Sequence, residues 1–265
     1  MTNPPFSLPS PAALWRALMD GCNLVCRTAP GYEAHLLLDS GQILTGEPHA
    51  DMNFAYIGSP SDAARHLRVF HERASARGLP LMVLSTEATT PHLKTEAAFL
   101  GLVPADEVPL MICRAPRPDL ANHPYRVELI HNSTVLTEAI PLAARTFGLP
   151  TAAVARVYNS QALTLPGVDY FIARREGTIW SFVQTTRMGS YVGIWSMATP
   201  PEYQRQGAGR ALLQAVLAHH QERGADFFYL IASSAGRALY QGVGFQETTR
   251  LTCWLSGTSA QVGGG

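Results

Sequence analysis

The sequence contains two successive copies of the same order of expected elements, and this repeat limits the possible folds more than any other feature. In the second half, the apolar stretches 167–173 and 178–183 flank a short turn that contains glycine, which predicts a β-hairpin. The first half has the same arrangement in residues 31–38 and 42–45. The chain therefore starts each copy with a hairpin.

The two copies continue to show the same order of elements after the hairpins. In each, a further strand leads into a helix that ends at glycine, Gly78 or Gly224, a residue that commonly stops helices. An apolar strand follows, 81–84 or 227–231, and then a second helix and a last strand. Since a run of matches in one order indicates duplication, the sequence predicts two similar α/β domains. Each is expected to hold a mixed, mostly antiparallel sheet flanked by helices.

Residues 114–124 separate the copies. This stretch contains three prolines and no apolar periodicity, which is typical of an extended linker. The predicted organisation is a first domain at 1–115, a linker at 116–124, a second domain at 125–257 and a flexible tail at 258–265.

The composition excludes several classes of protein. Hydrophobic residues make up 46% of the 265 residues and charged residues 15%, as in a compact globular chain. Twenty basic and twenty acidic residues balance, without the basic clusters of nucleic-acid-binding proteins. No apolar run approaches the roughly 18 residues of a membrane span, and the N-terminus lacks a signal-peptide pattern. We expect a cytoplasmic monomer or homodimer with no nucleic-acid or membrane partner.

The cysteines are too few and too scattered for a disulfide framework. Cys22 and Cys26 would share one helix face, but no second Cys/His pair with zinc-site spacing accompanies them. We expect these two residues, with Cys113 and Cys253, to be free and at least half-buried, and we expect no metal.

The segment 193–213 carries the clearest chemical pattern. An apolar strand, 193–199, is broken by two prolines and leads through a Gln/Gly turn into an amphipathic helix. Gly207 and Gly209 would let the backbone approach a ligand closely. Unpaired amides and the helix dipole favour negative charge at a helix start, so the pattern predicts a phosphate-binding turn.

Two familiar phosphate-binding patterns fit this turn poorly. A P-loop needs Gly-Lys-Ser/Thr at the helix entry, but Gly209 is followed by Arg210 and Ala211. A dinucleotide-binding fold needs a third glycine where Leu212 stands, and Asp226 opens the next strand instead of ending it. A dinucleotide-binding fold therefore stays only as a weak alternative interpretation of this phosphate-binding turn.

Residues 204–209, Gln-Arg-Gln-Gly-Ala-Gly, resemble the signature of the GNAT acetyltransferase superfamily, Gln/Arg-x-x-Gly-x-Gly/Ala. Residues 233–245 are similar to a later segment of that family, a short helix with Leu-Tyr followed by Gly-Phe. The resemblance is strong over 125–255 and extends to the first half only by analogy. It implies the GNAT fold and acetyl-CoA as co-substrate.

The resemblance also implies individual roles. The amide of Met197 would polarise the thioester carbonyl as an oxyanion-hole donor. Tyr240 would protonate the departing thiolate, unless its ring merely packs against the sheet. Ser233 would touch the arm of coenzyme A, where many relatives carry Asn. The other implied coenzyme A contacts are Ala198 and Thr199 for the pantetheine, and Gln204, Arg205, Gln206, Gly207, Ala208, Gly209 and Arg210 for the pyrophosphate turn.

Two departures from the family pattern matter. Several relatives carry a glutamate base where this chain has Gly193, and residues 193–199 contain no Asp, Glu or His, so the base is left open. In the first half, the turn at 59–65 has no glycine and places Asp62 at the helix start, where it would repel pyrophosphate. We expect a degenerate first domain that lacks coenzyme A binding and serves as scaffold or as a wall of the acceptor pocket.

The expected function is transfer of an acetyl group from acetyl-CoA to a primary amine of a small molecule. A protein or peptide acceptor and a non-catalytic sensor of coenzyme A are the alternatives. Trp195 is expected to be core or pocket wall. His219 and His220 are expected to be solvated or to act as cations at a helix C-terminus.

Overall fold

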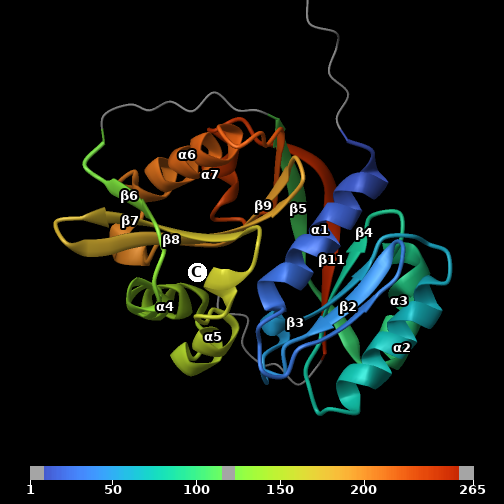
Figure 1. The fold of residues 1–265 in the computed structure, drawn as a ribbon. Helices are drawn as coiled ribbons and strands as arrows, with labels where there is room; N and C mark the ends of the chain where they lie inside the picture. The colour runs from blue at the N-terminus through green and yellow to red at the C-terminus, as the bar shows by residue number, and fades with distance from the viewer. Residues whose placement is uncertain (1–8, 115–122, 257–265) are drawn as a thin grey trace, which may run out of the picture.

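The computed structural model describes residues 9–114 and 123–256, which form a mixed α/β fold around one 11-stranded sheet (Figure 1). The strand order is β1-β2-β3-β4-β11-β5-β10-β9-β8-β7-β6. The strands are β1 (Glu33–Leu36), β2 (Ser40–Leu44), β3 (Asn53–Ile57), β4 (Met82–Thr86), β5 (Leu102–Arg114), β6 (Arg126–Leu129), β7 (Val168–Arg175), β8 (Thr178–Met188), β9 (Tyr191–Ala198), β10 (Phe227–Ile231) and β11 (Gln246–Ser256).

The described residues also form seven α-helices and three short 3-10 helices. The α-helices are α1 (Pro11–Cys26), α2 (Ala63–Ser75), α3 (Thr90–Phe99), α4 (Ser133–Phe147), α5 (Thr151–Val157), α6 (Ala208–Gln221) and α7 (Arg237–Gln241). The 3-10 helices are η1 (Ala50–Met52), η2 (Ala162–Thr164) and η3 (Pro201–Tyr203). None of the described helices combines the length and apolar character needed to cross a membrane.

The predicted repeat is confirmed element by element. The first half runs β1, β2, β3, α2, β4, α3, β5, and the second runs β7, β8, β9, α6, β10, α7, β11. Both predicted hairpins form, with β1 antiparallel to β2 and β7 antiparallel to β8. The turn of the second hairpin places Glu176 and Gly177 at positive φ, 51° and 81°, which explains the glycine.

The last strand of each half lies in the other half. β5 pairs with β10, and β11 pairs with β4, while β5 and β11 pair with each other at the centre of the sheet. The predicted mixed sheets are confirmed, and this exchange joins them into one. Residues 115–122, which include most of the expected linker, and the expected tail lie outside the described residues.

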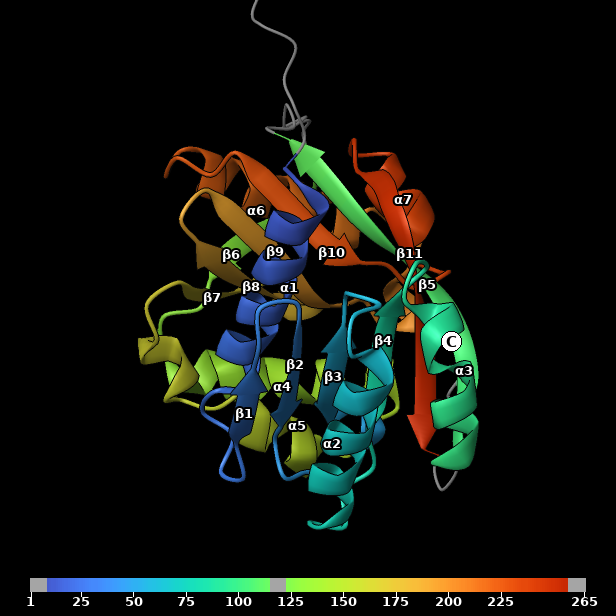
Figure 2. The same ribbon diagram turned by 90° about the vertical axis from the view of Figure 1, so that its right-hand side faces the viewer.

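The helices cover the two faces of the sheet according to the alternation of side chains along each strand. On β10, Phe228 packs with α6, whereas the adjacent Tyr229 packs with α1. On β3, Ala55 packs with α2, and Tyr56 packs with α1. Helices α1, α4 and α5 thus lie on one face, and α2, α3, α6 and α7 lie on the other (Figures 1 and 2).

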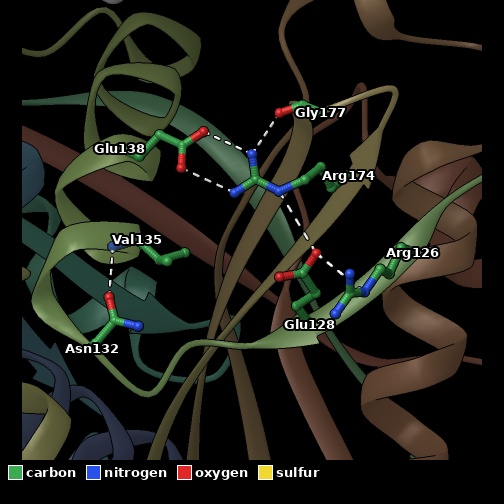
Figure 3. A network of polar contacts seen from close by, with 7 residues as sticks. All are labelled: Arg126, Glu128, Asn132, Val135, Glu138, Arg174 and Gly177. Atoms are coloured by element: carbon green, nitrogen blue, oxygen red, sulfur yellow. Dashed lines mark hydrogen bonds and ion pairs between the residues drawn. The ribbon is translucent and has the colours of Figure 1, made fainter.

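A polar network anchors α4 at the outer edge of the second half (Figure 3). Arg174 of β7 forms ion pairs with Glu138 of α4 at 2.8 Å and with Glu128 of β6 at 3.6 Å. The side chain of Asn132 caps α4 by accepting a 3.0 Å hydrogen bond from the Val135 amide. The ion pairs thus link α4 to β7 and β7 to β6.

Candidate active site

The candidate site begins where β9 separates from β10. Their parallel pairing spans only Tyr191↔Phe227 to Gly193↔Tyr229, although β9 continues to Ala198. In the described sheet, residues 194–198 therefore have no β10 partner on that side. Their backbone can pair with an extended ligand in the manner of an added strand. The predicted site residues Met197 and Ala198 lie in this segment, and Thr199 follows directly.

A β-bulge lies on the other side of the same segment. β8 pairs Phe182 with Ala198 and Gln184 with Trp195, so two residues, Ser196 and Met197, lie opposite one residue of β8. Ser196 has a φ of 50°, which is uncommon for a residue other than glycine. The bulge changes the direction of the backbone at Met197, the residue whose amide is the predicted oxyanion donor.

Helix α1 from the first half packs directly against this segment. A Cβ atom on Gly21 would lie 2.3 Å from the Tyr229 hydroxyl, 2.7 Å from Cζ2 of Trp195 and 2.8 Å from Thr186 Oγ1. Only glycine therefore permits this close approach. Trp195 donates a 2.7 Å hydrogen bond from its indole to Thr186 Oγ1, and its ring packs edge-to-face on Tyr229. Trp195 lies in the wall between α1 and β9, as expected.

Helix α5 also reaches the bulge. The hydroxyl of Tyr158, the residue after α5, hydrogen-bonds the hydroxyl of Ser196. Burial raises the pKa of Tyr158, which keeps the phenol protonated at neutral pH. The two hydroxyl groups lie next to the predicted oxyanion donor on the face covered by α1, α4 and α5.

The predicted phosphate turn connects η3 with α6. Arg205 and Gly207 both have positive φ, 60° and 92°, and Gly207 is the N-cap of α6. Gly207 has no side chain with which to cap the first amides of the helix, so these amides are available to an anion. Gln204 donates to the Thr199 carbonyl oxygen at 2.9 Å, which ties the turn to the end of β9.

Gly209 brings the turn and β9 together. A Cβ atom at this position would lie 3.3 Å from Thr199 Oγ1 and 3.5 Å from the terminal methyl group of Met197. The structure thus gathers the two predicted groups, 197–199 and 204–210, into one place. In addition, the hydroxyl of Tyr125 donates a 2.8 Å hydrogen bond to the Gln206 carbonyl oxygen, a support that the sequence pattern did not reveal.

Helix α7 closes the site from the side of α6. The same Cβ atom on Gly209 would lie 3.5 Å from Leu239, so α7 adjoins the phosphate turn. The ring of Tyr240 is buried against Phe245, and its hydroxyl forms no side-chain hydrogen bond within the described residues. Burial raises the pKa of Tyr240, so the hydroxyl carries its proton at neutral pH. Ser233 lies at the start of this segment, where its hydroxyl accepts from the Gly236 amide at 3.2 Å.

The corresponding region of the first half has a different geometry. β3 pairs with β4 up to Ile57, the last residue of β3, so these strands do not separate. The indole of Trp15 occupies the space beside Gly58, where a Cβ atom would lie 2.3 Å from Nε1. Asp62 starts α2 with a φ of 56°, and Phe99 at the end of α3 is 83% exposed. Asp62 shares the left-handed N-cap conformation of Gly207 and likewise makes no side-chain cap. The described first half therefore differs in its unseparated strands, its turn without glycine and the negative charge of Asp62.

The expectation for His220 was wrong. Its side chain is only 1% exposed, because it follows the buried Val216 by four residues on the inner face of α6. Burial, reinforced by nearby positive groups, lowers the pKa of His220 to about 3, so it is neutral and not a helix-end cation. The pKa of His219 is also lowered, chiefly by burial.

Comparison with known families finds a match within the second half. Residues 166–247 match the model of the acetyltransferase (GNAT) domain. The ribosomal protein bS18-alanine N-acetyltransferase of Escherichia coli (strain K12) is 33% identical over 82 residues, which cover 30% of this chain and 55% of that protein. The chain therefore spans about half the length of the curated relatives it matches.

Solved structures resemble almost the whole chain. A GCN5-related N-acetyltransferase from Kribbella flavida has a TM-score of 0.70 at 14% identity, over 96% of this chain and 98% of that one. A tandem GNAT protein from the clavulanic acid biosynthesis pathway has a TM-score of 0.57 at 14% identity, over 94% of each chain. At these identities the likeness concerns the fold, and it confirms the predicted tandem architecture.

Proposed function

Because the second half of the chain contains a GNAT acetyltransferase domain, we propose that the protein transfers an acetyl group from acetyl-CoA to a primary amine. The observation that carries this proposal is the separation of β9 from β10 after Gly193, beside the uncapped start of α6. An extended arm fits along the free side of β9, and a pyrophosphate fits at the helix start.

We propose the following roles for the predicted site residues. The neutral amine attacks the thioester carbon, and the negative charge that develops on the carbonyl oxygen is stabilised by the Met197 amide. The carbon–sulfur bond then breaks, and the thiolate takes the proton of the Tyr240 hydroxyl. The attacking nitrogen loses one proton to solvent, and solvent returns one proton to the Tyr240 phenolate. Ala198 and Thr199 hold the pantetheine, Ser233 adds a contact to the arm, and the amides of residues 205–210 hold the pyrophosphate.

We propose a small-molecule amine as the acceptor. The observation that favours it is the close packing of α1 on Trp195 and Tyr229, which covers the sheet face beside β9. We therefore expect a narrow approach to the thioester. A peptide amine is the second candidate, because a relative that acts on the alanine of a ribosomal protein aligns with part of this chain.

The test is release of free thiol from acetyl-CoA across a panel of amines. The panel contains amino acids, polyamines and aminoglycoside antibiotics in one arm and peptides with N-terminal alanine in the other. Turnover in the first arm supports a small-molecule acetyltransferase, and turnover only in the second assigns a peptide acceptor. Saturable acetyl-CoA binding without thiol release in either arm would contradict the enzyme and favour a coenzyme A sensor.

A further inference from the structure

Three metal-ligating side chains meet at the C-terminal end of α6, away from the candidate active site. Asp169 of β7 and the adjacent His219 and His220 of α6 each offer one ligand atom, and these atoms lie within 4.8 Å of one another. α6 and β7 lie next to each other in the second half (Figure 1). A rise of about 1.5 Å per residue places this cluster roughly 20 Å from the phosphate turn along the helix.

His220 supplies an independent sign of a missing ligand. Its Nε2 lies 3.0 Å from Thr185 Oγ1, and the Thr185 hydroxyl is directed at 3.5 Å toward the carbonyl oxygen of Asp169. In the tautomer in which Thr185 donates to that carbonyl, the Nε2–H of His220 donates to Thr185 Oγ1, and Nδ1 carries a lone pair. This Nδ1 is buried and has no hydrogen-bond partner among the residues that the structure describes. Such an orphaned atom is costly unless something binds it.

We propose that Asp169, His219 and His220 bind a zinc ion. Two imidazole nitrogens and one carboxylate oxygen are ligands that Zn²⁺ accepts, and a water molecule would complete a tetrahedral shell. The hydrogen bond from Nε2 to Thr185 fixes the ring in the way that outer-shell partners fix zinc-bound histidines.

The surroundings of the cluster suit such an ion. Asp169 and His219 are only half-buried, so an ion can reach the site from solvent. The ion would connect the end of α6 to the second strand from the sheet edge, and its role would be structural.

The proposal is tested by equilibrium dialysis of chelator-treated full-length protein against Zn²⁺, with metal analysis by mass spectrometry. The expected result is one equivalent of Zn²⁺ that Mg²⁺ does not displace, because imidazole ligands select against Mg²⁺. Co²⁺ bound in place of Zn²⁺ should show the visible absorption of a low-coordinate site. Failure of the wild-type protein to bind Zn²⁺ would overturn the proposal.

Variants locate the ion. Asp169→Asn and His219→Ala should each weaken Zn²⁺ binding at least about tenfold, the lower end of what even outer-shell changes cost. His92→Ala, on the exposed surface of α3, is the matched control and should bind as the wild type does. These positions are chosen because removal of the buried His220 risks unfolding. Wild-type affinity in both variants would mean that the ion binds elsewhere and would also overturn the proposal.

Discussion

The hydroxyl of Tyr229 donates a 2.6 Å hydrogen bond to the backbone carbonyl oxygen of Ala17, although 212 residues separate the two in the sequence. Both residues are buried, so this bond lies inside the molecule. It attaches α1 of the first half to β10 of the second, beside the point where β9 and β10 separate. Together with the exchanged strands, it joins the two halves of the molecule.

The first prediction is that neither half folds alone. We expect a chain interrupted between Pro118 and Asp119 to give two fragments that purify as a complex when expressed together. Each fragment carries the strand that completes the other's sheet, so the complex should unfold in a single transition. Co-purification and chemical denaturation measure this. A second fragment that folds alone as a monomer with full acetyl-CoA affinity would contradict it.

The second prediction is that one molecule of acetyl-CoA binds per chain. The first half lacks both the separated strands and the glycine turn, because β3 stays paired with β4 up to Ile57. Isothermal titration calorimetry should give a stoichiometry near one. A value near two would show that the first half also binds the ligand.

The third prediction concerns Gly209→Glu, which should weaken acetyl-CoA binding strongly. The new side chain would project between Thr199 and Met197, and its charge would oppose the pyrophosphate. Ala64→Glu is the matched control, because Ala64 is the second residue of α2 as Gly209 is of α6. Calorimetry should show a loss only in the first variant. Equal acetyl-CoA affinities of the two variants would contradict the prediction that residues 204–210 bind the pyrophosphate.

The fourth prediction is that Tyr240→Phe lowers turnover about 10²- to 10⁴-fold, the usual contribution of general acid catalysis. The Michaelis constant for acetyl-CoA should change little, since protonation of the thiolate is felt only in the transition state. Tyr191→Phe, which removes a hydroxyl from a ring stacked on Phe227, serves as control. Steady-state kinetics with an accepted amine measure both constants. Wild-type turnover in Tyr240→Phe would show that Tyr240 is a packing residue and not the general acid.

The fifth prediction is that the folded protein resists thiol alkylation. All four cysteines are free and buried. Burial raises the pKa of Cys113 to about 11 and that of Cys253 to about 12, so at pH 8 about one thiol in a thousand or fewer is the reactive thiolate. Iodoacetamide should label these cysteines only after unfolding in urea. Rapid labelling of Cys113 in native protein, seen by mass spectrometry, would refute this.

The local elements were predictable from sequence because their signals are local. Alternating apolar residues and a glycine turn define the β7–β8 hairpin, and glycine at 207 marks the start of α6. The strand exchange was not predictable. β5 and β11 carry apolar residues that suit either half, and the choice between them depends on contacts far apart in sequence.

The candidate site was likewise predictable in its local motifs but not in its long-range contacts. The order of motifs correctly indicated that 197–199 and 204–210 lie together, since the helix follows the strand directly. The place where β9 leaves β10 is not encoded in either strand alone. The prediction that His220 is solvated or a helix-end cation was wrong because it followed from the polar side chain and not from the position of His220 on the buried face of α6. The contribution of α1, through Gly21 against Trp195, could be found only once the halves were packed.

The position of β11 also has a consequence for biosynthesis. Its residues are made last among the described strands, yet they complete the sheet of the half that is made first. While the ribosome translates the second half, β4 must wait with an open edge, which is a template for unwanted strand pairing. The order of translation therefore leaves the first half without its closing strand until the second half has been made.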